Sequence, residues 1–278
     1  MKKEKIRSLR GYPLCVLILC MCILPVYAVD NFRITDIRSL GMGGNGVTQS
    51  VLSNPSLVCF YDGKQVQIDY FNRYSVKELG TIHAGFIYSN TLLPAAVDIF
   101  SFGFDGYREN MFRLSMGKQL NRKWKIGISI QYALLQTELS EKVLQGLSTD
   151  VGILYSPVDK LLIGLLIMNL PSVTVHSEDT NIKILNDYSI QIGFQWSVIN
   201  SLLIAGTVES NKTVYLTGSV GVEYIPFNRF SIRAGMNLSP LQPSLGIGYC
   251  FSRFSLDVAG TYHTVLGIST GVGIKYAF

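Results

Sequence analysis

The chain has 278 residues, of which 24 are Lys or Arg and 19 are Asp or Glu, and charged residues make up only 15% of it. So few charges exclude a largely disordered chain, and the formal net charge of +5 excludes a protein that grips nucleic acid through its phosphates. Gly, Tyr and Phe are abundant, at 26, 15 and 14 residues, and the mean hydropathy of +0.28 is high for a water-soluble protein. This composition favours β-strands in a membrane.

Residues 1–28 have the pattern of a secretory signal peptide. An apolar stretch over residues 14–24 follows a basic start and precedes a small-residue cleavage site that ends at Ala28. The apolar stretch is too short for a comfortable spanning helix. We therefore predict export and cleavage after Ala28. The basic residues that leave with the leader are Lys2, Lys3, Lys5, Arg7 and Arg10, so the mature chain is nearly neutral.

The mature chain has no apolar run of the ~18 residues that a spanning helix needs, and its apolar residues alternate with polar or small ones instead. In residues 124–134, for example, Trp124, Ile126 and Ile128 alternate with Lys125 and Gly127. Segments of about ten residues are longer than soluble strands of ~5 to 6 and suffice to cross a bilayer at a tilt. We predict about fourteen strands of a membrane barrel, with a soluble β protein as the alternative. They lie near residues 64–73, 81–89, 95–104, 110–119, 123–136, 148–156, 160–169, 186–197, 200–209, 212–224, 228–238, 243–251, 252–262 and 265–278.

The lengths of the connections predict the orientation of the strands, because outer-membrane barrels have short periplasmic turns and longer external loops. Tight connections are expected at residues 120–122, 157–159, 198–199 and 226–227. The longest connections, residues 137–147 and 170–185, fall in the class that faces outward. An even strand count places both ends of the barrel on the periplasmic side.

A glycine-rich stretch precedes the first predicted strand. Residues 41–46 (GMGGNG) fit the dinucleotide-binding pattern G-x-G-x-x-G, but the residues that follow have no helical apolar period. Gly41, Met42, Gly43 and Gly44, together with the stretch that begins at Asn54 and Pro55, resemble the amino-terminal region of the FadL and PorV/PorQ outer-membrane proteins. Ser56 departs from the alanine that is common in those proteins.

The resemblance implies an all-β fold, a transmembrane antiparallel barrel of fourteen strands with its amino-terminal segment folded into the lumen as a plug. We accordingly predict a plug over residues 29–63 and a barrel over residues 64–278, with a disordered periplasmic leader as the alternative to the plug. Glycine lets the backbone of one segment pass close to another. The glycines with inward parity are Gly127, Gly193, Gly221, Gly235, Gly271 and Gly273.

The last strand resembles the outer-membrane β-signal. Ile274 and Tyr276 lead on alternate positions to an aromatic residue, Phe278. The resemblance implies recognition by the barrel-assembly machinery. An ordinary final strand is the alternative.

Residues 161–168 break the alternation because they are apolar on both faces around Gly164. Two interpretations remain open. The inward side chains pack against the plug, or Leu162, Leu166 and Met168 line the path of a hydrophobic ligand. In FadL-type transporters the third and fourth external loops gather hydrophobic substrate, and residues 137–147 and 170–185 would correspond to them.

The histidines and the remaining cysteines carry no recognisable chemistry. His83 is predicted inward, whereas His176 and His263 lie in or beside outer loops, and none has metal-ligand spacing to another. We expect no metal, no cofactor and no catalytic residue, although a barrel hydrolase with its acid and base near His176 is a minor alternative. Whether Cys59 and Cys250 form a disulfide is left open.

The function that the resemblance implies is non-enzymatic. We expect a monomer in the bacterial outer membrane, in contact with its lipid, that passively captures or passes small hydrophobic molecules. The alternative is a non-transporting accessory barrel of the type IX protein secretion system, as PorV and PorQ are, whose partners are secretion-system proteins.

Overall fold

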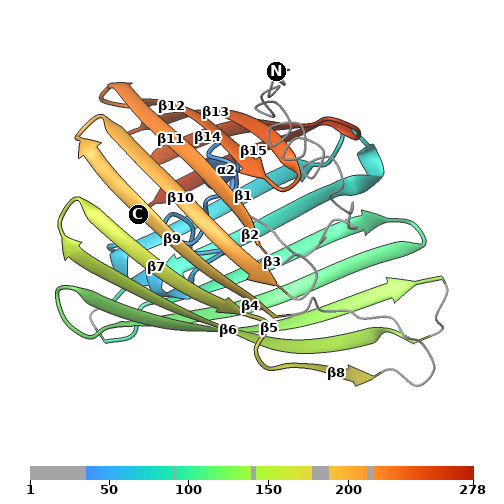
Figure 1. The fold of residues 1–278 in the computed structure, drawn as a ribbon. Helices are drawn as coiled ribbons and strands as arrows, with labels where there is room; N and C mark the ends of the chain where they lie inside the picture. The colour runs from blue at the N-terminus through green and yellow to red at the C-terminus, as the bar shows by residue number, and fades with distance from the viewer. Residues whose placement is uncertain (1–35, 91, 139–141, 177–187, 212–215) are drawn as a thin grey trace, which may run out of the picture.

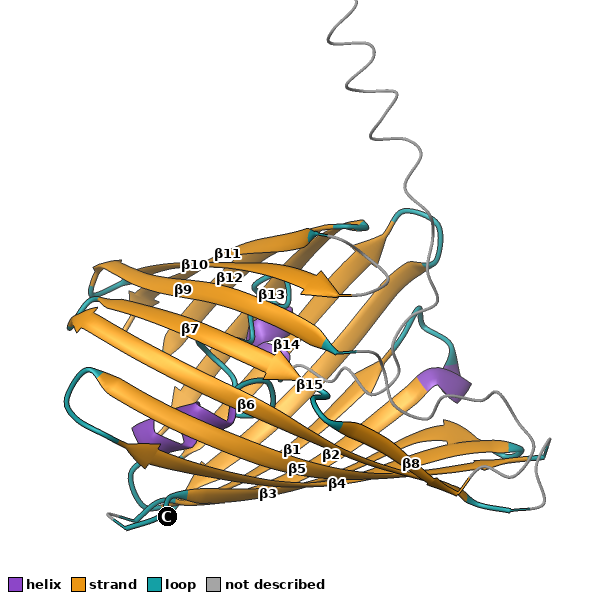
Figure 2. Cartoon of the chain, turned by 60° about the horizontal axis from the view of Figure 1, so that its bottom comes forward, coloured by secondary structure: helices purple, strands orange, loops and turns teal. Residues whose placement is uncertain are grey.

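The computed structural model describes residues 36–90, 92–138, 142–176, 188–211 and 216–278. The predicted signal peptide and residues 29–35 of the predicted plug lie outside the described residues. The described chain forms an antiparallel sheet that curls into a barrel, with the short helix α2 (Ile37–Leu40) and the 3-10 helix η1 (Pro55–Phe60) inside it (Figure 1, Figure 2). A further 3-10 turn, η2 (Lys77–Leu79), lies between the first two strands.

No helix in the described part of the chain is both long and apolar enough to cross a membrane.

Fifteen strands make up the sheet, and every long strand of the described chain has a hydrogen-bonded neighbour on each side. Closure comes from β1 pairing with β15 and from β5 pairing with β6. A closed wall suits a membrane, where an unpaired backbone N–H or C=O has no water to bind. The strands are β1 (Lys64–Asn72), β2 (Gly80–Tyr88), β3 (Ala95–Phe104), β4 (Tyr107–Gln119), β5 (Trp124–Thr137), β6 (Leu144–Val158), β7 (Leu161–Met168), β8 (Ser172–His176), β9 (Ser189–Ile199), β10 (Leu202–Asn211), β11 (Thr217–Phe227), β12 (Phe230–Leu238), β13 (Leu241–Phe251), β14 (Phe254–His263) and β15 (Gly267–Ala277).

The wall has fourteen positions because β7 and β8 occupy one of them. Both strands pair with β6, and residues 169–171 interrupt the ladder between them. The fourteen-stranded barrel that the sequence predicts is therefore confirmed, and each long strand overlaps its predicted range. The strand β8 was missed, since residues 170–185 were predicted as a loop. Residues 177–187 of that loop lie outside the described residues.

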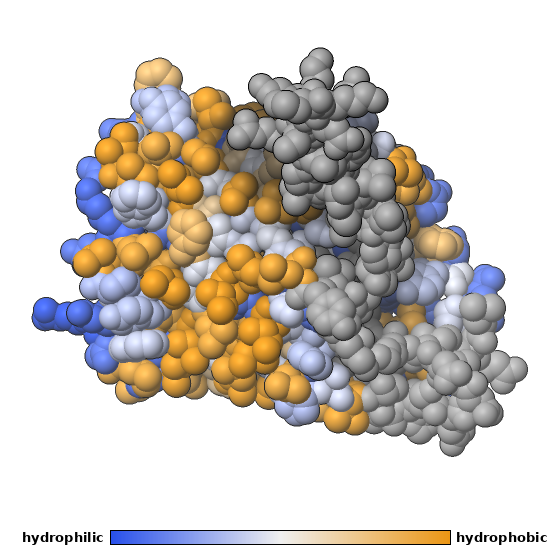
Figure 3. Space-filling view, in the orientation of Figure 1, coloured by the Kyte–Doolittle hydropathy of each residue, from blue (hydrophilic) through white to orange (hydrophobic). Residues whose placement is uncertain are grey.

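Side chains alternate between a buried inner face and an exposed outer face, as the period of two predicts. In β5 the outward residues Ile126, Ile128 and Ile130 are exposed, whereas Gly127 and Ser129 are buried. Exposed apolar side chains cover much of the outer surface in the face that Figure 3 shows. The chain is thus a membrane barrel with an apolar exterior and a largely polar interior.

The two ends of the barrel differ in their connections. The terminal end holds the start of β1 and the end of β15 together with the short turns at residues 159–160, 200–201, 228–229 and 252–253. The opposite end, called the loop end below, holds the longer connections at residues 73–79, 138–143 and 169–188. The four tight connections and the two longest ones lie at opposite ends, as predicted, although residues 89–94 form a longer connection at the terminal end and residues 105–106 and 239–240 form short turns at the loop end. The strands run two residues further than expected at Val158 and three further at Phe227.

An arginine on the outer face should be costly only at the middle of the membrane. Ile130→Arg places a charge halfway along β5, where the expected loss of unfolding free energy is ~2 to 4 kcal/mol, whereas Phe227→Arg at the terminal end should cost ~0 to 1 kcal/mol. Urea unfolding of both variants in lipid vesicles measures the difference. Equal losses would contradict the depth that the barrel assigns to the two residues.

Candidate functional site

Residues 36–60, called the N-terminal segment below, lie inside the barrel, and most of their side chains are buried. Asp36 caps α2, because its Oδ1 accepts a hydrogen bond from the backbone N–H of Ser39 at 3.1 Å. Asn54 caps η1 in the same way through the N–H of Ser56 at 3.1 Å, and its amide donates to the carbonyl of Val47 at 2.9 Å. These local bonds give the segment a compact shape in the absence of a strand partner.

Glycines of the wall form the surface on which the N-terminal segment rests. A Cβ atom added at Gly127 or Gly152 would overlap Pro55, Ser56 or Asn54, and one at Gly221 or Gly235 would overlap Met42. All six glycines that the sequence places on the inward parity, at positions 127, 193, 221, 235, 271 and 273, lie against this segment. The missing side chains let two backbones approach closely.

The glycine motif of the segment serves the same close approach. Gly43 has a φ of +78°, its N–H donates to Ser244 Oγ at 2.8 Å, and a Cβ there would lie 2.7 Å from the backbone nitrogen of Met236. Met42 is fully buried, and Gly41 lies against Gly246. The motif therefore contacts the barrel wall and has no helix or strand arrangement for binding a dinucleotide.

Ion pairs attach the start of the N-terminal segment to β11–β15. Arg38 pairs with Glu223, whose Oε1 also accepts from Arg233 Nε at 2.7 Å. Lys275 Nζ lies 3.0 Å from Asp36 Oδ2. Burial raises the pKa of Asp36, but Lys275 and the bonds from Ser39 outweigh it and hold that pKa below the ordinary value of 3.8. The carboxylate is thus kept charged inside the barrel.

A second attachment joins the end of the segment to β4–β6. Arg113 donates to the carbonyls of Leu52 and Ser53, the latter at 3.3 Å, and its guanidinium lies 2.7 Å from Asp150 Oδ2. Ser129 Oγ donates to the same carboxylate oxygen at 3.1 Å. A buried charge is tolerated when it is paired and hydrogen-bonded, as it is here.

Between the two attachments, His83 on β2 lies between two aspartates. Its Nδ1 is 2.8 Å from Asp69 Oδ2 and its Nε2 is 3.1 Å from Asp98 Oδ1, while its ring stacks on Phe100. The inward direction predicted for His83 is confirmed. The three groups of ionisable residues form what we call the charged band, with six carboxylates, four Arg or Lys side chains and one histidine: Asp36, Asp69, Asp98, Asp150, Glu223, Asp257, Arg38, Arg113, Arg233, Lys275 and His83.

An apolar surface covers the inside of β3–β6 toward the loop end. Cross-strand pairing places Phe100 beside Met111 and Met111 beside Ala133, and it places Leu135 beside Leu144. All these side chains are buried, and Leu52 of the N-terminal segment packs on Phe100 and Met111. With Phe102 they form what we call the apolar face, which also holds the buried side chain of Glu109 between Phe102 and Leu135. The apolar side chains of this face offer a hydrophobic molecule a surface to contact.

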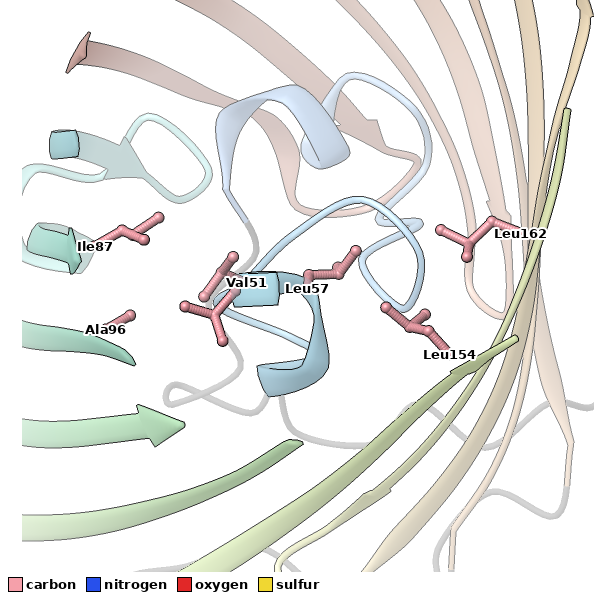
Figure 4. Close-up of a cluster of buried hydrophobic side chains, with 7 residues drawn as sticks. Val51, Leu57, Ile87, Ala96, Leu154 and Leu162 are labelled. Atoms are coloured by element: carbon pink, nitrogen blue, oxygen red, sulfur yellow. The ribbon is translucent and has the colours of Figure 1, made fainter. Parts of the chain in front are cut away.

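The ligand path that the sequence predicts follows β7 and is not part of the apolar face. Leu162 belongs to a buried cluster with Val51 and Leu57 of the N-terminal segment, and Figure 4 shows this segment between Ile87 on one wall and Leu162 on the other. Leu166 is fully buried as well.

Met168 is half-buried, and its sulfur accepts a hydrogen bond from Gln191 at 3.2 Å. The contacts of Leu162 match the packing interpretation of β7, while a ligand path along Leu162, Leu166 and Met168 stays a prediction. The apolar face was missed, although adjacent apolar pairs such as Ile99–Phe100 and Met111–Phe112 mark it by the same criterion as residues 161–168.

The histidines and cysteines are placed as follows. In the part of the chain that the structure describes, no three His, Cys, Asp or Glu side chains could hold a metal ion. His263 is buried, and its Nδ1 accepts the backbone N–H groups of Val265 and Leu266, so it shapes a turn at the loop end. His176 ends β8. Cys59 and Cys250 are both free, which answers the disulfide question in the negative.

The predicted assembly signal lies on the outer face at the terminal end. Ile274 is exposed, and the Tyr276 ring meets that of Phe278 edge-on at 4.8 Å. The N–H of Phe278 donates to the carbonyl of Lys64 at 2.9 Å, which extends the seam between β15 and β1. Recognition of these residues by assembly machinery stays a prediction.

Together the closed wall and the segment within it define a fourteen-stranded membrane barrel of the FadL type of fold. No family model and no curated protein matches the sequence. The solved CymD monoaromatic hydrocarbon channel aligns with a TM-score of 0.66 at 15% identity, over 90% of this chain and 99% of that chain. The Ralstonia pickettii toluene transporter TbuX gives 0.69 at 11% identity, over 90% and 100%. A Pseudomonas aeruginosa FadL homologue gives 0.61 at 10% identity, over 88% and 98%. The fourteen-stranded barrel that the FadL resemblance implies is confirmed, while the plug stays a prediction.

Filling a wall glycine should loosen the N-terminal segment. Gly235→Ala adds a Cβ that overlaps the backbone of Met42, so we expect a loss of ~1 to 3 kcal/mol in unfolding free energy from overpacking. Gly260→Ala is the matched control, because the nearest atom to its added Cβ is 3.5 Å away. Urea unfolding in detergent compares the two. Equal stability of both variants would show that Met42 does not rest on Gly235.

Asp36 makes a pH-dependent contribution to the free energy of unfolding. Asp36→Asn leaves Lys275 without its 3.0 Å partner and should cost ~1 to 3 kcal/mol. Since the folded pKa of Asp36 is below its unfolded value, the contribution is complete above the unfolded pKa and is lost as the pH falls through the folded pKa. The difference between wild type and variant should stay constant above pH ~5 and shrink below pH ~4. A difference that grows toward acid would contradict this assignment.

Proposed function

We propose that the chain is a non-enzymatic outer-membrane barrel that passively captures or passes small hydrophobic molecules. The observation that carries the proposal is the apolar face on the inside of β3–β6, toward the loop end. Solved barrels of the same fold are a monoaromatic hydrocarbon channel and toluene transporters, which agrees with it. The driving force is the gradient of the solute, because the proposal includes no cofactor and no energy source.

The N-terminal segment is proposed to act as the plug of this barrel. It bridges opposite walls at the level of Ile87 and Leu162 and is held by ion pairs at Arg38 and by hydrogen bonds from Arg113 (Figure 4). A molecule that entered from the loop end would meet the apolar face first and the segment next. The plug would thus separate capture at the loop end from the terminal end.

The cellular setting follows from the same proposal. The leader over residues 1–28 would direct export, and the strand that ends at Phe278 would be read by the barrel-assembly machinery. The loop end would then face outward and the terminal end would face the periplasm. The protein would function as a monomer surrounded by outer-membrane lipid, since its closed wall leaves no long strand edge for a second copy.

A polar substitution on the apolar face tests the function. Met111→Gln keeps the approximate volume of the side chain and should reduce uptake of radiolabelled naphthalene by cells about fivefold, because it removes apolar contact with the solute. Met116→Gln is the matched control on the outward face of the same strand. Membrane levels of both variants are equalised before uptake is compared.

Two outcomes would contradict the proposal. Uptake that does not depend on the presence of the barrel at all would remove the transport function. Unchanged uptake together with impaired surface delivery of secreted proteins would favour an accessory of protein secretion instead.

A further inference from the structure

The inside of the barrel has two chemically different faces toward the loop end. Opposite the apolar face, the inward positions of β9–β13 carry uncharged polar side chains, and Figure 1 shows β11 and β12 across the barrel from β4 and β5. Cross-strand pairing joins them, through Glu209 between Gln191 and Thr217 and through Gly235 beside Ser244, into one surface. We call it the polar face: Gln191, Thr207, Thr217, Ser219, Asn237 and Ser244.

The polar face lacks the cations that would bind a carboxylate. Its described inward positions at the loop end include Glu209 and no Lys or Arg. The charged band that follows pairs each of its four Arg or Lys side chains, and His83, with a carboxylate. Arg73, at the rim of the apolar face, holds its guanidinium 5.9 Å from the ring centres of Phe71 and Phe102 and also interacts with a further group. The cations of the band therefore already have carboxylate partners when an anionic solute arrives.

One hydroxyl of this surface and one amide of the N-terminal segment lack hydrogen-bond partners among the described residues. The hydroxyl of Thr207 is buried and has no partner among the described residues. It lies beside Gly193, on which Val47 of the N-terminal segment rests. Two residues further along the segment, both amide atoms of Gln49 are buried without a partner. Burying such groups dry costs free energy, so a solute that supplies partners gains affinity there.

We propose that the solute is an uncharged amphipathic molecule, an aromatic or alkyl skeleton that carries hydroxyl or carbonyl oxygen, and that Thr207 and Gln49 select it by hydrogen bonding. The skeleton contacts the apolar face while its oxygen turns toward the polar face. This inference rests on the proposed function and narrows it. It distinguishes the cargo from plain hydrocarbons, which leave Thr207 and Gln49 unpaired, and from carboxylates, which meet cations that already have carboxylate partners.

Three probes with one skeleton test the inference. Naphthalene, 1-naphthol and 1-naphthoate are titrated into the purified barrel in detergent, with empty micelles as the blank. We expect 1-naphthol to bind about tenfold more tightly than naphthalene, since one or two added hydrogen bonds are worth about threefold to tenfold each. Binding of 1-naphthoate should be weaker than that of 1-naphthol.

A single isosteric variant assigns the selectivity. Thr207→Val removes the unpartnered hydroxyl and should lower 1-naphthol affinity about threefold to tenfold while leaving naphthalene affinity unchanged. Thr270→Val, on the outward face of β15, is the matched control. Faster gel mobility of unboiled than of boiled samples verifies that both variants are folded.

The other possible results contradict either this inference or the proposed function. Equal binding of naphthalene and 1-naphthol, or no effect of Thr207→Val on 1-naphthol, would mean that water alone satisfies the polar face, and the inference fails while the proposed function stands. Tightest binding of 1-naphthoate would overturn the uncharged class and point to Arg73. Binding of none of the three probes would count against the proposed function itself.

Discussion

Closure of the wall is the constraint on which the rest of this structure depends. In a bilayer every backbone N–H and C=O needs a partner within the protein, and a sheet meets that need only when its first and last strands pair. Here β1 pairs with β15 over residues 65–72, and the seam continues through the N–H of Phe278. Once the wall is closed, each strand has one face toward lipid and one toward the interior, which is why the period of two persists through all long strands.

A closed wall of fourteen strands encloses more space than its own side chains fill. The N-terminal segment of the same chain occupies part of that space. Wall glycines admit the backbone of this segment, while Arg38, Lys275 and Arg113 fix its position. The segment occupies the level of the charged band and contacts the apolar face of β3–β6 through Leu52.

Much of the fold could be predicted because the alternation in strands such as β5 repeats over many residues. The strand β8 escaped because five residues behind Pro171 are too few to display a period. The inward parity of the glycines was readable, since parity is a local property. Which residue of the N-terminal segment contacts which glycine could not be predicted. The contact of Met42 with Gly221 and Gly235 depends on the stagger of the strands in the whole barrel.

For the candidate site, too, local patterns could be predicted from the sequence and long-range contacts could not. The apolar character of residues 161–168 was visible, yet whether Leu162 meets a ligand or the chain itself depends on where residues 51–58 run. Cys250 has the same parity on β13 as the buried Ser244 and Gly246, and its exposure follows from its place near the terminal end of that strand. Partners that are far apart in the sequence, such as Arg38 and Glu223, leave no local pattern from which their contact could be derived.

The long reach of the N-terminal segment also orders the events of folding. Arg38 and Glu223 are 185 positions apart, and Asp36 and Lys275 are 239 positions apart. In the unfolded chain these charges are therefore far from the strands that neutralise them. The segment therefore has no stable place until β11–β15 arrive, and those are the strands that complete the wall. Filling the interior and sealing the barrel become one cooperative step, so a chain truncated before β15 would lack both.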